Sequence, residues 1–139
     1  MLNMKLFTTP RFLLTICMIG MLFLACSKDD KNEETNNLIA GSWTAFSWTL
    51  DGDEQIGGIL ASSFKMVYNS ESTTGGTSTW TIVNGTGFVS TINNDYTIEN
   101  DGRTLSLDGT DFEITFNGDQ VKLSGFVQNQ DYIVEATKD

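Results

Sequence analysis

Apolar and polar residues alternate with a period of two over most of the chain after Leu38, a pattern that predicts short β-strands. In DFEITF, Phe112, Ile114 and Phe116 share one side, and Glu113 lies on the other with the polar residues. The same alternation recurs in FKMVY (64–68), VKLS (121–124), YIVEA (132–136) and, more briefly, YTIE (96–99) and TLSL (104–107). We therefore expect each strand to turn one face to a core and the other to solvent.

Turn dipeptides separate these segments and accept the positive φ that tight hairpins require. They are Asn84-Gly85, Asp101-Gly102, Asp108-Gly109 and Asn117-Gly118. No convincing helical stripe follows Leu38, because the sole candidate, Gln55–Ser63, is weakened by paired glycines. The pattern predicts an all-β fold, an antiparallel meander of about eight short strands that closes into a small barrel and so removes its edges.

The first 25 residues have a different pattern. Phe12 to Ala25 is a run of 14 uncharged residues, preceded by Lys5 and Arg11. As a helix it would span about 20 Å, less than the roughly 30 Å of a bilayer core. We predict that residues 1–25 are a signal peptide. A transmembrane anchor is the alternative, although acidic residues follow too closely for a longer span.

Cys26 follows this run directly. The stretch FLAC resembles a bacterial lipobox, in which a small residue, here Ala25, precedes a cysteine that is acylated and becomes the new N-terminus. Phe23 departs from the branched aliphatic residue usual in that motif. The resemblance implies several acyl chains such as palmitate on Cys26, and therefore stable attachment to a membrane. An idle thiol is the alternative.

Residues 26–37 are polar and rich in acids, and we expect them to form a flexible tether. Their Lys28-Asp29-Asp30 resembles the signal that directs lipoproteins of Bacteroidota to the outer face of the outer membrane, although a solvated linker would look the same. The expected location is the outer membrane, with the protein lipid-anchored on its periplasmic or cell-surface side.

Residues 38–139 form the expected folded domain. Its opening, LIAGSWTAFSWTLDG, resembles the lipocalin-like domains of Bacteroidota lipoproteins, in which Gly-x-Trp, here Gly41-Ser42-Trp43, begins the first strand. YTIENDGRTLSLDGTDFEITFNGDQVKLSG resembles the closing meander of the same family. The resemblance implies a lipocalin-like barrel in which Trp43 plugs one end and Gly41 lets the chain pass closely beneath it.

The tryptophans are the candidate ligand-binding residues: Trp43, Trp48 and Trp80. The interior of an eight-stranded barrel is either filled by side chains or holds one small ligand, and both remain open. Trp48 shares its parity with Phe46, whereas Trp43 lies on the other parity. The strand is therefore kinked or two-faced, and an exposed Trp48 could stack on sugars.

Composition narrows the chemistry. The chain of 139 residues has 8 Lys and Arg, 18 Asp and Glu and no histidine, which argues against a nucleic-acid partner and against histidine-based catalysis or zinc binding. Asp51 to Glu54 lack the ligand spacing of a calcium loop, and no pair of acids stands out as catalytic. We expect no enzymatic activity, no metal and no cofactor.

The expected function is that of a monomeric, lipid-anchored envelope protein that binds a small apolar ligand or nothing. A glycan-binding or adhesion module is one alternative. An inhibitor or accessory subunit of an envelope complex is the other.

Overall fold

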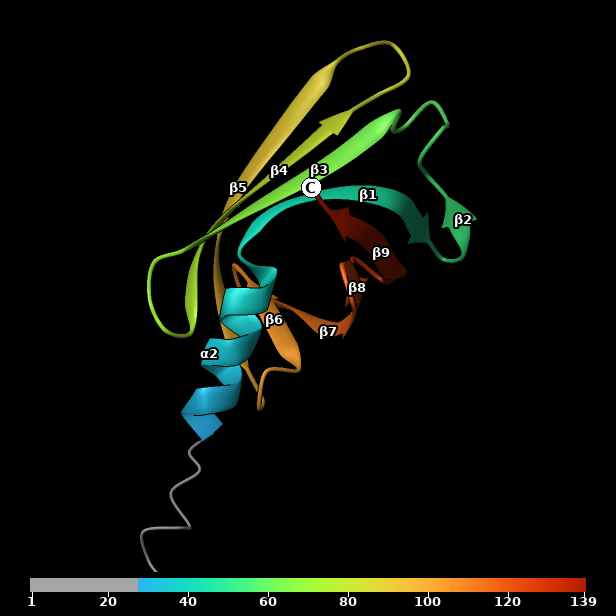
Figure 1. Cartoon of the computed structure of the whole chain (residues 1–139). Coiled ribbons are helices and arrows are strands. Elements are labelled where there is room, and N and C mark those ends of the chain that lie inside the picture. The colour runs from blue at the N-terminus through green and yellow to red at the C-terminus, as the bar shows by residue number, and fades with distance from the viewer. Residues whose placement is uncertain (1–27) are drawn as a thin grey trace, which may run out of the picture.

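A computed structural model describes residues 28–139, which form one helix and an antiparallel sheet (Figure 1). The helix is α2 (Lys28–Ile39). The strands are β1 (Gly41–Leu50), β2 (Asp53–Glu54), β3 (Ser63–Ser70), β4 (Gly75–Val83), β5 (Val89–Glu99), β6 (Thr104–Leu107), β7 (Thr110–Asn117), β8 (Gln120–Val127) and β9 (Gln130–Lys138). Within residues 28–139, no helix has the length and apolar character needed to cross a bilayer.

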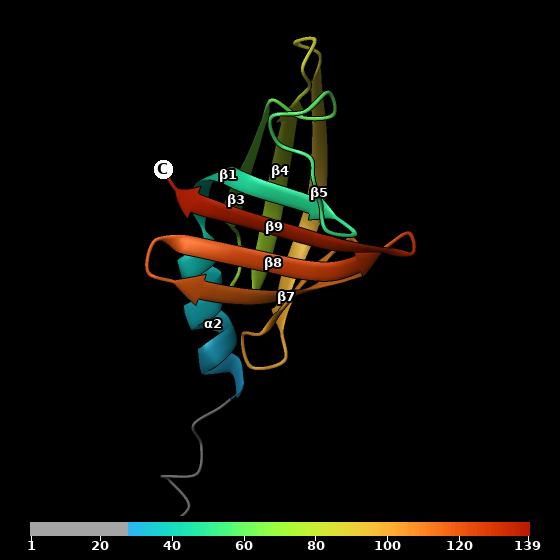
Figure 2. The same ribbon diagram turned by 90° about the vertical axis from the view of Figure 1, so that its right-hand side faces the viewer.

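Eight of the strands close into a barrel. Each strand from β3 to β8 pairs with the next, and β1 completes the circle by pairing with β3 on one side and β9 on the other. β2 adds only a short pairing at the end of β1. In Figure 2, β1, β7, β8 and β9 run across the view while β3, β4 and β5 stand upright, so two walls of the barrel cross over one another. The predicted antiparallel meander, closed into a small barrel, is confirmed.

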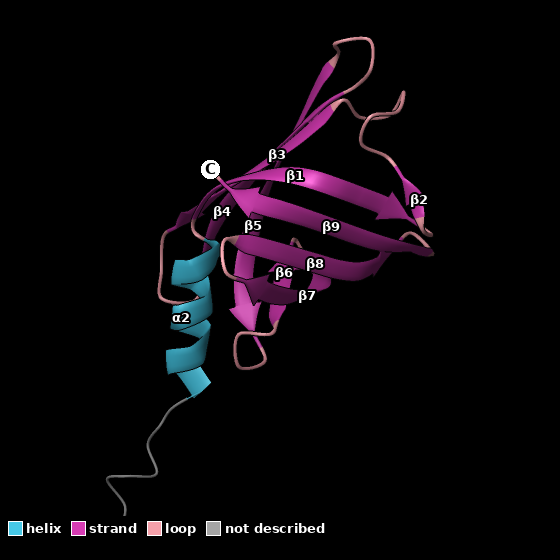
Figure 3. Cartoon of the chain, turned by 45° about the vertical axis from the view of Figure 1, so that its right-hand side comes forward, coloured by secondary structure: helices cyan, strands magenta, loops and turns pink. Residues whose placement is uncertain are grey.

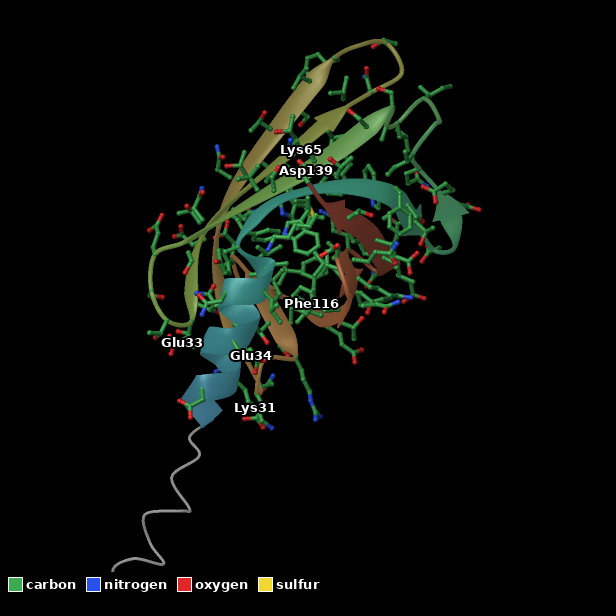
Figure 4. The ribbon with its side chains drawn as sticks, in the orientation of Figure 1. Lys31, Glu33, Glu34, Lys65, Phe116 and Asp139 are labelled. Atoms are coloured by element: carbon green, nitrogen blue, oxygen red, sulfur yellow. The ribbon has the colours of Figure 1, made fainter. Side chains whose placement is uncertain are left out.

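The alternation that predicted the strands also predicted their buried faces. Phe112 and Ile114 are each 4% exposed, whereas Glu113 is exposed. Phe116 shares the inward face but is only half-buried, against Trp43 with 6.2 Å between ring centroids. Figure 4 shows Phe116 among the side chains that crowd the barrel interior. The core therefore lies inside the barrel, as the period of two requires.

A bulge in β1 explains the conflicting parity of its tryptophans. The pairing with β9 shifts between Ala45 and Ser47, so that Phe46 is an extra residue. Trp43 and Ala45 are buried before the bulge, and Trp48 packs against the core after it. Phe46 is turned outward and is 51% exposed. The expected kink is present, and it turns Trp48 inward.

The turn chemistry follows the sequence at most connections. Asp108 (φ 46°) and Gly109 (φ 83°) join β6 to β7 as a two-residue turn, since Leu107 and Thr110 pair across it. The other three predicted dipeptides also lie at strand ends or between strands. The turn between β8 and β9 was missed, because its positive-φ residues are Gln128 and Asn129 rather than an Asn-Gly or Asp-Gly pair.

The prediction of a flexible tether over residues 26–37 is wrong for residues 28–37, which belong to α2. The polar composition suggested a flexible segment, because it contains no apolar stripe through which a helix could dock on the barrel. Its contacts with the barrel are mainly hydrogen bonds: Thr35 and Asn36 donate, and Asn32 accepts from the Gly102 N–H. Among the described side chains of α2, Ile39 alone joins the apolar core. A segment without apolar periodicity can still be ordered when its polar groups find buried partners.

The docking of α2 centres on two turns. Asn36 is fully buried: its Nδ2 donates to Ser70 Oγ and to the Ser72 carbonyl, both at 2.8 Å, and its Oδ1 accepts from the Tyr96 hydroxyl at 2.7 Å. On the turn between β5 and β6, Gly102 (φ 77°) lies so close that a Cβ there would collide with Thr35 Oγ1. α2 thus covers one end of the barrel, here called the closed end; the opposite end is called the open end (Figure 3).

Trp43 sits where the chain passes from α2 into β1. Its Nε1 donates to the Ile39 carbonyl at 2.7 Å, which satisfies one of the free carbonyls at the helix end. The Lys138 ammonium lies 5.3 Å from the Trp43 ring centroid and donates to the Leu38 carbonyl. Gly41 (φ 119°) adopts a backbone conformation that favours glycine. The expected position of Trp43 at one end of the barrel is observed.

Candidate functional site

The open end carries the hairpin turns that point away from α2. They are the turns β4–β5 (84–88), β6–β7 (108–109) and β8–β9 (128–129), together with the longer connection 51–62. Figures 1 and 2 show that the β4–β5 hairpin projects well beyond the rest of the barrel on this side. Side chains on the inward face of that hairpin therefore overhang the opening rather than the packed core.

A pocket of about 270 Å³ opens at this end, called here the mouth pocket. Its lining residues come from β4 to β9 and the turns between them: Trp80, Ile92, Asn94, Leu107, Asp108, Thr110, Phe112, Val127 and Tyr132. Six of the nine are apolar or aromatic, which is the usual composition of a small-molecule site. The volume is slightly below the usual range of about 300–1,000 Å³, so the pocket suits a small ligand.

Five aromatic side chains form the floor and wall of this end, and we call them the aromatic cluster. They contact one another in a closed circuit, with centroid distances of 5.4 Å (Trp48–Phe64), 5.4 Å (Phe64–Trp80), 6.0 Å (Trp80–Phe112), 5.7 Å (Phe112–Tyr132) and 5.8 Å (Tyr132–Trp48). These distances are typical of favourable aromatic pairs. The cluster separates the packed interior below from the mouth pocket above.

The polar atoms of the aromatic side chains are satisfied toward the closed end. Trp80 Nε1 donates to the Tyr68 hydroxyl at 3.2 Å. Burial raises the pKa of Tyr96 to about 12, so at neutral pH its hydroxyl is protonated and donates to Asn36. Within residues 28–139, by contrast, the buried Trp48 Nε1 has no hydrogen-bond partner. The open end therefore keeps unused hydrogen-bonding capacity.

Glu54 fastens the loop beside the cluster to β1. Its carboxylate accepts from the backbone N–H groups of Trp48 and Ile56, each at 2.9 Å, and from Ser47 Oγ at 2.7 Å. Slight desolvation raises the pKa of the exposed Glu54 carboxyl, but these hydrogen bonds outweigh it and lower the pKa below its ordinary value. The ionised carboxylate thus holds the bulged end of β1 in place.

The charge at the open end has one sign. Asp108 lines the mouth pocket, and Asp51, Asp53 and Asp131 lie in neighbouring connections or at their edges. Lys65 and Lys122 are paired on the outer wall with Asp139 (2.7 Å) and Glu135 (3.4 Å). Figure 4 shows the Lys65–Asp139 pair close together. Among the described side chains, no Lys or Arg lines the mouth pocket.

Exposed apolar side chains surround the same end. The largest exposed fractions are those of Ile59 (83%), Phe88 (68%), Phe126 (64%) and Leu60 (61%). The connection before β3 and the β4–β5 turn touch, because Gly85 N–H donates to the Ile59 carbonyl at 3.1 Å. The exposed apolar side chains of these two segments are therefore brought to the same part of the open end.

Three hollows of about 400–430 Å³ are larger and lie on the outer surface. One lies beside Phe46 and the Lys122–Glu135 pair, one along the exposed side of α2, and one over polar residues of β4 and β5. None is bounded by the aromatic cluster. The mouth pocket is therefore the better candidate site despite its smaller volume.

The structure separates the three predicted tryptophans. Trp80 lines the mouth pocket, and Trp48 contacts its wall through Tyr132. Trp43 lies at the closed end, 1% exposed, and is remote from the pocket lining. Trp48 is half-buried rather than fully exposed, because the bulge at Phe46 turns it inward. Cys26 lies outside the described residues.

Most of the pocket lining was missed as a site. The alternation placed Phe112 and Tyr132 on inward faces, but it could not say at which end of the barrel each would lie. That depends on strand register, which pairs Gly125 with both Phe112 and Tyr132 and so brings the two rings together. Within residues 28–139, no group of three or more acidic or thiol side chains is arranged to hold a metal ion.

No family model matches the chain, and no curated protein matches it. Among solved structures, a redesigned β-barrel superposes with a TM-score of 0.58 at 12% identity, over 76% of this chain and 95% of that one. This likeness shows the barrel fold alone.

Two proteins of Streptococcus pneumoniae are also similar. One, described as a lipocalin lipoprotein affecting virulence, has a TM-score of 0.42 and 22% identity, over 72% of this chain and 91% of that one. The other, described as a lipoprotein, has a TM-score of 0.39 and 19% identity, over 69% and 90%.

Proposed function

We propose that the protein is a non-catalytic binding protein that holds a small apolar ligand in the mouth pocket. The observation that carries this proposal is the pocket itself, an aromatic-walled hollow of about 270 Å³ at the one end of the barrel that α2 does not cover. Burial of apolar surface against Trp80, Phe112 and Tyr132 would supply the affinity.

Binding can be tested with a variant that fills the pocket. Ile92 lines the mouth pocket, and its side chain is 43% exposed, so Ile92→Trp should occupy the space without disturbing the core. Titration with the neutral apolar dye N-phenyl-1-naphthylamine should give a fluorescence increase with the parent protein, and an affinity at least about tenfold weaker with Ile92→Trp.

Val89→Trp is the matched control, because Val89 lies on the same strand, is 53% exposed and does not line the pocket. Equal dye binding by the parent and both variants would contradict the proposed site. The absence of dye binding by the parent protein would contradict the proposed function.

We further propose that the protein is held at the outer membrane through acylated Cys26. The proposal is supported by the sequence FLAC and by the position of α2, which begins two residues after Cys26. An anchor there would lie next to the closed end and leave the mouth pocket facing away from the membrane. The Lys28-Asp29-Asp30 motif lies in the first turn of α2. Its resemblance to the signal of Bacteroidota lipoproteins supports a location at the outer membrane.

Intact-mass measurement of the protein from its native membrane tests the anchor. It should give a chain that begins at Cys26 and carries acyl groups, and Cys26→Ser should release the protein into the soluble fraction. An unmodified thiol at Cys26 in the membrane-bound protein would contradict the proposal.

The glycan-binding alternative has less support than the binding of an apolar ligand. It requires solvent-facing tryptophans, whereas Trp43 and Trp80 are 1% and 6% exposed and Trp48 packs against Phe64 and Tyr132.

A further inference from the structure

We propose that the ligand of the mouth pocket is a small apolar molecule that carries a positively charged amine, and that a carboxylate of the same size is excluded. The inference rests on the proposed function, since it specifies the class of ligand for the same pocket. It follows from three features of the described residues: the aromatic walls, the one charged group in the lining, and the placement of every described cation.

The pocket wall is aromatic, with Tyr132 half-buried and Trp80 and Phe112 buried behind it. Trp80, Phe112 and Tyr132 all line the mouth pocket, and the three rings lie within 6.5 Å of one another, centroid to centroid. Aromatic faces attract cations, most strongly at tryptophan, and the attraction increases when the cation is desolvated. An ammonium group on an apolar body would therefore be stabilised by the same rings that bind the body.

Asp108 supplies the matching negative charge. It is the one ionisable acid or base in the pocket lining apart from the Tyr132 phenol. Its Oδ1 accepts from the Asp95 backbone N–H at 3.3 Å, and the Asn94 amide, turned so that its nitrogen donates, lies 3.0 Å from Oδ2. Both partners are neutral, so they orient the carboxylate without neutralising it. A charge-assisted hydrogen bond to an ammonium group would both orient the carboxylate and neutralise its charge.

None of the described Lys or Arg side chains lines the mouth pocket. Lys65 and Lys122 pair with acids on the outer wall, and Lys138 binds the end of α2. Lys31 lies on α2 and Arg103 on the β5–β6 connection, both on the closed side. A carboxylate ligand would thus meet no counter-charge in the pocket lining and would lie beside the carboxylate of Asp108, an unfavourable arrangement.

The charge of the whole chain acts in the same direction. With 18 acidic and 8 basic residues, the protein has a formal net charge of −10. Such a field concentrates cations near the surface and repels anions, more strongly at low ionic strength. The local and the overall electrostatics therefore favour the same ligand class.

The test uses three ligands with one skeleton: 4-phenylbutylamine, 4-phenylbutanol and 4-phenylbutyrate, which are positive, neutral and negative at pH 7. Octylamine, octanol and octanoate form a second series. The protein is the chain from residue 26 with Cys26→Ser, which retains every described residue. Calorimetric titration at low salt should show the amine binding about tenfold more tightly than the alcohol, and the carboxylate more weakly than the alcohol.

Asp108→Asn tests the residue directly. Asparagine accepts the positive φ of this turn position and keeps an oxygen for the Asp95 N–H, so the fold should survive. The variant should lose most of the preference for the amine over the alcohol and leave the affinity for the alcohol unchanged. Asp111→Asn is the matched control: it removes the same charge from an exposed position of β7 that does not line the pocket, and the preference should persist.

The outcomes separate the two proposals. Binding of the alcohols without a preference for the amines overturns the amine inference and leaves the apolar-binding function standing. Tighter binding of the carboxylates, or an equal loss of preference in Asp111→Asn and Asp108→Asn, also overturns the inference. Failure of all six ligands to bind the parent protein overturns both.

Discussion

At the scale of single residues, the inward or outward direction of a side chain follows from the alternation, but its role does not. Phe112 and Phe116 occupy the same face of β7, yet Phe112 is 4% exposed and Phe116 is only half-buried. The difference arises because Phe112 is enclosed by the aromatic cluster, whereas Phe116 lines a surface hollow at the other end of β7. The position of an inward side chain along the barrel axis decides what surrounds it, and the alternation in the sequence contains no information about that position.

Truncation of these side chains should reveal the difference in stability. Phe112→Ala should reduce the free energy of unfolding by about 3–5 kcal/mol, because it removes a buried ring from the cluster. Phe116→Ala should cost less, since part of its ring is already solvated, and Glu113→Ala should cost less than about 0.5 kcal/mol. Urea melts of the three variants measure these values. If Glu113→Ala were as damaging as Phe112→Ala, the assigned faces of β7 would be wrong.

At the scale of elements, the strands were predictable and the helix was not. Each strand has one apolar face that the barrel buries, so its period of two survives in the sequence. α2 has no such face: of its described residues, only Ile39 reaches the apolar core, and Asn36 makes its connections through an amide. Its order depends on partners in turns 34 to 70 residues away, among them Ser70 and Gly102. No local pattern could indicate those contacts.

Asn36 should therefore be as important for α2 as an apolar anchor would be. Asn36→Ala leaves the Tyr96 hydroxyl and the Ser72 carbonyl without their partner, which should reduce the free energy of unfolding by about 2–4 kcal/mol. Asn37→Ala, one residue further along the helix at an exposed position, should cost less than about 0.5 kcal/mol. Urea melts combined with hydrogen exchange of the α2 amides measure both effects. Equal stability of the two variants would show that α2 is not held through Asn36.

At the scale of the whole molecule, the barrel is polarised. The closed end is sealed by α2, Trp43 and hydrogen bonds that satisfy the buried polar atoms there. The open end carries the mouth pocket, exposed apolar side chains and acidic connections. The barrel and its tryptophans could be predicted from the sequence. The pocket could not, because it depends on the register that brings the inward residues of six strands to one end.

The indole N–H signals of the three tryptophans provide the most direct measurement of the central claim that the open end binds the ligand. They can be assigned in ¹⁵N spectra from single Trp→Phe variants and followed during titration with 4-phenylbutanol. The signal of Trp80 should shift progressively, that of Trp48 should follow through Tyr132, and that of Trp43 should stay fixed, because Trp43 lies at the closed end and is hydrogen-bonded to Ile39. A saturating shift confined to Trp43, or no shift of any indole signal, would contradict the account.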